Sequence, residues 1–97
     1  MATIVIGTEV EDKARSRWSY DVTVTDDAGG EHRFDVTLGW SDYDLWSRGR
    51  VPPSRVVEAA FRFLLANEPV GSIMARFDCS VIRRYFPQVD RELPGFF

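Results

Sequence analysis

Residues 18–25, WSYDVTVT, and residues 33–38, RFDVTL, alternate apolar and polar side chains along the chain. A period of two is typical of β-strands that place one face on a core and the other in water. Between them, residues 26–30 read DDAGG, a composition typical of a turn. Antiparallel pairing of Val22 with Phe34 keeps the apolar side chains on one face. A slip of one residue would put half of them in water, so we expect this register.

The same period recurs near the N-terminus, at Ile4 and Ile6 and then at Thr8 and Val10. A third strand is therefore expected there, followed by a charged connection over residues 11–17. The first part of the chain is predicted to be an antiparallel β-meander of about three strands.

The strongest helical pattern covers residues 55–67, which are apolar on most sides. The helix is expected to open at Pro52-Pro53-Ser54 and to end before Pro69. Glu58 and Arg62 lie one turn apart on its narrow polar stripe. A helix this apolar is expected to be buried on two sides, either between the sheet and later helices or between two protomers.

Three shorter helices are expected, each opened by a side chain that accepts a hydrogen bond at its N-terminus. They cover residues 41–48, 73–77 and 79–86. The first opens with the capping box of residues 41–44, SDYD, in which Asp44 takes the N3 position, and the other two open with Ser72 and Asp78. Pro87 ends the last of them, before a tail rich in apolar residues.

These patterns together predict an α+β fold. An antiparallel β-meander of about three strands is followed by three or four α-helices packed on one face. With 97 residues, the chain is expected to be a single domain over 1–97. Residues 1–39 form the meander, and residues 40–97 form the helical half with an apolar C-terminal tail.

The composition disfavours several classes of protein. A net charge of −3 argues against the strongly basic face of most nucleic-acid-binding domains. One cysteine, Cys79, and one histidine, His32, can build neither an intrachain disulfide nor a structural Cys/His zinc site. The start MATIVIG lacks the features of a signal peptide, and no apolar run reaches the length of a membrane helix. We therefore expect a protein of the cytoplasm without membrane contact.

One segment shares a pattern with other proteins. It reads FxFLLxxEP over residues 61–69, followed by Ile73, Phe77-Asp78, Ile82 and YFP at residues 85–87. This segment resembles a group of small bacterial proteins of unknown function. The resemblance implies a free-standing bacterial domain, and it implies no activity, ligand or catalytic residue.

Aromatic residues make up 13% of the chain, a share that favours some aromatic surface at an interface. The leading prediction is a non-enzymatic protein-interaction or accessory domain that binds an unknown protein or a second copy of itself. A homodimer is expected to form through a sheet edge or the long helix. The terminal Phe side chains are expected to pack on their own domain or a sister protomer, or to dock on another protein. The predicted contact residues are Trp40, Tyr43, Trp46, Phe96 and Phe97.

A first alternative is a helix-turn-helix over residues 72–86 that binds nucleic acid. Arg76, Arg83 and Arg84 would contact phosphates. Asp78 in the turn, the short second helix and the negative net charge argue against it.

A second alternative is a small metal-dependent enzyme. Asp42 and Asp44 carry the oxygen ligands that Mg²⁺ or Ca²⁺ prefers, and Asp35 is a further candidate neighbour. Capping of the helix explains both acids without a metal, so no cofactor is expected.

Two further groups of residues could carry chemistry. Cys79 at a helix N-terminus, with His32 as base, would form a nucleophile pair, but a lone cysteine is usually a buried apolar residue. The polar face of the sheet is interpreted as solvated; it contains Asp21, Thr23, Thr25, Arg33, Asp35 and Thr37.

Overall fold

The structure, a computed structural model, describes residues 2–97. Strands β1 (Thr3–Asp12), β2 (Arg17–Thr25) and β3 (Glu31–Gly39) form an antiparallel meander. Val22 lies opposite Phe34, so the predicted register is confirmed. The α+β class is likewise confirmed.

Strand β1 contains a β-bulge. The register shifts between Ile6 and Glu9, and the Asp21 carboxylate fills the gap by accepting a hydrogen bond from the Thr8 N–H at 2.7 Å. A Cβ on Gly7 would lie 2.2 Å from Asp21 Oδ2, so a side chain at this position would displace the Asp21 carboxylate. Beyond the bulge, Glu9 rather than Thr8 lies on the core side. The simple alternation expected from residue 4 to residue 10 therefore does not continue through the strand.

The sheet has a fourth strand, β4 (Arg76–Asp78), which pairs in parallel with β3. The predicted helix over residues 73–77, capped by Ser72, is wrong. A 3₁₀ turn, η1 (Val70–Ser72), is followed by extended chain, and the Ala75 carbonyl accepts a hydrogen bond from the Asp35 N–H at 2.8 Å. Pairing with the free edge of β3 overrides the local helical pattern, and the sheet is mixed rather than purely antiparallel.

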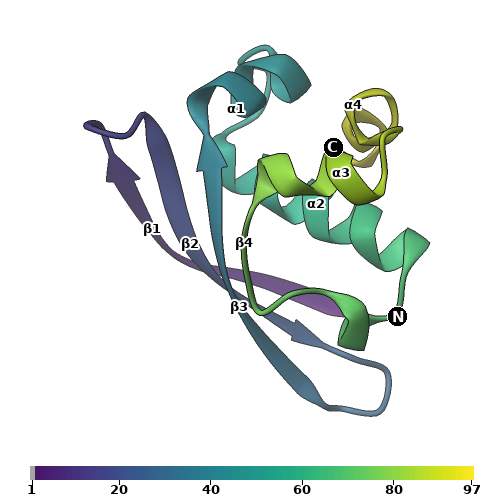
Figure 1. Ribbon diagram of the computed structural model, residues 1–97. Coiled ribbons are helices and arrows are strands. Elements are labelled where there is room, and N and C mark those ends of the chain that lie inside the picture. Colours follow the sequence, from purple (N-terminus) through teal and green to yellow (C-terminus); the bar gives the residue numbers. More distant parts are fainter. Residues whose placement is uncertain (1) are drawn as a thin grey trace.

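Within residues 2–97 the chain forms four α-helices and two further 3₁₀ segments beyond η1 (Figure 1). These are α1 (Trp40–Ser47), α2 (Pro53–Asn67), η2 (Cys79–Val81), α3 (Ile82–Tyr85), α4 (Val89–Glu92) and η3 (Leu93–Phe96).

Helix ends follow the sequence signals in part. Helix α2 begins at Pro53, as predicted. Asp78 accepts a hydrogen bond from the Ser80 N–H at 3.0 Å, as a cap should. The capping box predicted at residues 41–44 is wrong, because α1 begins at Trp40, directly after β3, and no side chain caps it.

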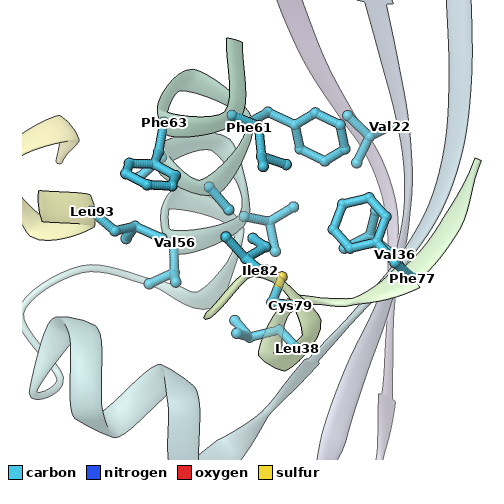
Figure 2. Packing of buried hydrophobic residues seen from close by; sticks show 14 of the residues in the cluster. Val22, Val36, Leu38, Val56, Phe61, Phe63, Phe77, Cys79, Ile82 and Leu93 are labelled. Carbon is cyan, nitrogen blue, oxygen red and sulfur yellow. The ribbon is translucent and has the colours of Figure 1, made fainter. Parts of the chain in front are cut away.

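Helix α2 lies across one face of the sheet (Figure 1). Figure 2 shows Phe61 pointing toward Val22 of the sheet, while Phe63 points toward Leu93 on the opposite side of α2. The helix is therefore buried on two sides within one chain, which was the first of the two expectations. No second protomer is needed to cover it. The described residues contain no helix long and apolar enough to cross a bilayer.

Candidate functional site

An apolar groove of about 430 Å³ lies between the end of α2 and the start of α3. Its floor is made of buried side chains from four segments of the chain: Leu64, Ile73, Phe77 and Ile82. Residues 73–78 are extended instead of helical, and this segment contributes Ile73 and Phe77 to the floor. The unexpected strand thus forms part of the groove.

Two large side chains stand exposed on the rim of this groove. Met74 is 43% exposed and Tyr85 is 66% exposed. Methionine adapts its shape to different partners, and tyrosine is enriched at protein interfaces. Exposed apolar surface beside an apolar floor is typical of a binding site.

One carboxylate, that of Glu68, also lines the groove. It is partly buried, and desolvation raises its pKa above the usual range. Among residues 2–97 it has no hydrogen-bond or ion-pair partner. Arg62, on the last turns of α2, donates two hydrogen bonds to Glu58 instead, at 3.1 and 2.9 Å.

A polar cluster on the helices, here called the Arg83 cluster, pairs its charges internally. It consists of Arg83, Asp42, Asp90 and Trp46. Arg83 of α3 donates to Asp42 Oδ1 at 2.8 Å and to Asp90 Oδ1 at 2.9 Å, while the Trp46 indole donates to Asp90 at 2.8 Å. The guanidinium carbon also lies 5.5 Å from the centroid of the Trp46 ring. Hydrogen bonding to Arg83 lowers the pKa of Asp90. This cluster joins α1, α3 and α4 and is a structural feature.

The Arg83 cluster changes the interpretation of the metal candidates. Asp42 is buried at 8% exposure against Arg83, whereas Asp44 is exposed. The two are not brought together with a third ligand, and the described residues contain no group of three His, Cys, Asp or Glu that could hold a metal. Capping, the other sequence explanation for both acids, is also wrong.

The three arginines of the nucleic-acid alternative fall in different settings. Arg76 lies on β4 beside Asp35 at 3.4 Å, Arg83 belongs to the Arg83 cluster, and Arg84 is exposed. The predicted helix-turn-helix over residues 72–86 is wrong in its first helix, which is strand and turn. The geometric basis for that alternative is therefore missing.

The aromatic contact candidates do not share one exposed surface. Trp40 is 37% exposed and packs against Trp18, as does Tyr43, whose hydroxyl donates to the Val51 carbonyl at 2.6 Å. Trp46 is only 3% exposed, so it offers no contact surface in this conformation.

The two terminal Phe side chains pack back on the core of their own domain. Phe96 packs edge-on against Phe63, at 6.2 Å between ring centroids, and Phe97 also lies against the core. This was the first of the expectations for the tail.

Cys79 and His32 lie in separate surroundings and do not form a pair of nucleophile and base. Cys79 is fully buried, and burial raises the pKa of its thiol, as expected of an apolar packing residue (Figure 2). His32 lies on the hairpin, 2.9 Å from Asp26 Oδ2.

Sequence reasoning missed Glu68, Met74 and Tyr85 as a group. Met74 and Tyr85 were counted within helices, and the groove depends on a strand that the local pattern did not indicate. The available signal was the absence of charge-pair partners for Glu68 at the end of α2.

The chain matches no protein-family model, and comparisons with curated proteins and with solved structures found no match. The resemblance of residues 61–87 to small bacterial proteins therefore stays a prediction.

Proposed function

We propose that this chain is a non-enzymatic protein-interaction domain of the bacterial cytoplasm, and that its groove receives an apolar segment of a partner protein. The observation that carries the proposal is the pairing of Met74 and Tyr85, both exposed, with the apolar floor below them. Such a surface gains about 1.5–3 kcal/mol for each large apolar side chain that it buries.

The shape of the groove favours a protein segment as occupant. It is lined from the end of α2, from β4 and from α3, and it is large enough for a few side chains. An extended or helical peptide can lay two or three apolar side chains into such a groove. Met74 on one rim can adjust to their shape.

Affinity capture from bacterial lysate tests this proposal. The wild-type chain, the double variant Met74→Ser/Tyr85→Ser and the matched control Leu45→Ser are used as baits, with nuclease present. Leu45 is 52% exposed and lies on α1, outside the groove. A partner retained by wild type and control but lost by the double variant would support the groove as the docking site.

Two outcomes would contradict the proposal. A partner retained equally by all three baits would place recognition elsewhere on the chain. Absence of any specific protein on the wild-type bait, with nucleic acid recovered when nuclease is omitted, would favour the nucleic-acid alternative.

A homodimer is a second candidate, because β1 is a ten-residue edge strand of the sheet. Val5 and Val10 on this strand are 55% and 56% exposed. Open edges of this kind pair readily with another strand, although the bulge and the acidic residues of β1 oppose it. Light scattering at high micromolar concentration tests the dimer, and a monomeric mass would contradict it.

A further inference from the structure

We infer that the groove recognises a partner segment that places a cationic group, a lysine or arginine head, beside its apolar anchor. Glu68 is the residue that selects it. The inference rests on the proposed function and names the chemistry of the partner. Its first support is position, because Glu68 lines the same hollow as Ile73 and Phe77.

The local charges leave Glu68 without a cation of its own. Arg62, one and a half turns earlier on α2, is held by Glu58. No basic side chain lines the groove among the described residues. Glu68 therefore lines the groove while its carboxylate has no ion-pair partner among the described residues.

Two further features make a negative charge unfavourable at this point. Glu68 caps the C-terminal end of α2, and its N–H donates to the Leu64 carbonyl at 2.8 Å. The C-terminal end of a helix carries partial negative charge, which repels a carboxylate and attracts a cation. Partial burial, which raises the pKa of Glu68, adds to this cost.

An arriving segment would change this balance according to its own charge. A purely apolar segment would desolvate Glu68 further without replacing the lost water. An anionic segment would add repulsion. A cation beside the anchor would satisfy both the carboxylate and the end of α2, so it is the complementary partner.

A set of three small probes with one shared apolar body tests the inference. These are 4-phenylbutylamine, 4-phenylbutan-1-ol and 5-phenylpentanoate, which share a phenyl ring with four methylenes and differ only in the head group. Each is titrated into the ¹⁵N-labelled full chain, and amide shifts of residues 73–77 report occupancy of the groove. The amine is expected to bind about three- to five-fold more tightly than the alcohol, the range of a partly exposed ion pair. The carboxylate is expected to bind most weakly.

The variant Glu68→Gln removes the charge and keeps the shape. In this variant the amine and the alcohol are expected to bind equally, while Glu11→Gln, an exposed acid on β1 outside the groove, keeps the wild-type preference. Raising the salt concentration should also reduce the preference of the wild type. Thermal melts of both variants confirm that they are folded.

The outcomes separate this inference from the proposed function. If all three probes shift residues 73–77 with equal affinity, or if Glu68→Gln keeps the amine preference, the selection by charge is wrong and the groove remains an apolar site. If none of the probes shifts these residues, both proposals fail.

Discussion

Two carboxylates of this chain, Asp90 and Glu68, differ in whether the fold provides them with a charged partner. Asp90 accepts hydrogen bonds from Arg83 and Trp46, and the Arg83 bonds lower its pKa. Glu68 has no such partner among residues 2–97, and desolvation raises its pKa. The folded chain places a cation beside Asp90 and, within the described residues, none beside Glu68.

This difference distinguishes a carboxylate that stabilises the fold from one that is assigned to binding a partner. Arg83 links α3 to α1 and α4 through the carboxylates of Asp42 and Asp90, which lie 41 and 7 residues away in the chain. Removing such a partner should destabilise the fold. The Glu68 carboxylate makes no such contact among the described residues, so Glu68→Gln should keep the fold intact and mainly alter binding.

Among the changes to charged residues, the largest effect is expected from Arg83→Met. The methionine keeps contact with Trp46 but leaves Asp42 and Asp90 without a cation. A cost of about 2 kcal/mol in the free energy of unfolding is expected, below that of a fully buried pair, because Arg83 is partly exposed. Urea denaturation measures it, with Arg84→Met as the exposed control. Equal losses in the two variants would mean that the Arg83 cluster contributes no specific stability.

A pH effect should follow from the same cluster. The pKa of Asp90 is lower in the folded state than in the unfolded state, where it is about 3.9. Its stabilising contribution is therefore present above that value and is lost as the pH falls through the folded pKa. The stability difference between wild type and Arg83→Met should shrink when denaturation is repeated at pH 3. A difference that stays constant from pH 7 to pH 3 would contradict this assignment.

Smaller changes are expected at the rim of the groove. Met74→Ser/Tyr85→Ser should alter the free energy of unfolding by less than about 0.5 kcal/mol, because both side chains are exposed. A matched comparison is Phe77→Ser on the groove floor, which should destabilise the fold strongly. A large loss in the rim variant would mean that Met74 and Tyr85 belong to the core.

The smallest effect is expected from Glu68→Gln, and its sign is opposite to that of the Arg83 variant. The folded pKa of Glu68 lies above its unfolded value, so stability is lost as the pH rises through the folded pKa. At pH 7 the Gln variant should therefore be slightly more stable than wild type, by a few tenths of a kcal/mol. Below about pH 4 the two should coincide, since Glu68 is then protonated. A destabilised Gln variant at pH 7 would indicate a structural partner for Glu68.

The sequence predicted the elements whose pattern is local. Alternation in residues 18–25 and 33–38 was enough to give the register, because each side chain reports its own face of the sheet. The prolines before α2 and its apolar surface likewise predicted a helix buried on two sides. Asp78 was recognised as a cap.

The misses depend on contacts distant in sequence. Residues 73–77 have a helical composition, but the free edge of β3 holds them as a strand. Asp42 was interpreted as a cap or a metal ligand, yet its partner Arg83 is 41 residues away. The groove lies between segments placed by these contacts, so no local pattern could have indicated it.

The most direct test of the groove as a recognition site is photocrosslinking in bacterial cells. A benzophenone amino acid is placed at position 74, on the rim, or at position 10, an exposed apolar site on β1. We predict a discrete crosslinked partner from position 74 and none from position 10. Crosslinks from position 10 alone, or the same products from both positions, would contradict the assignment of the groove.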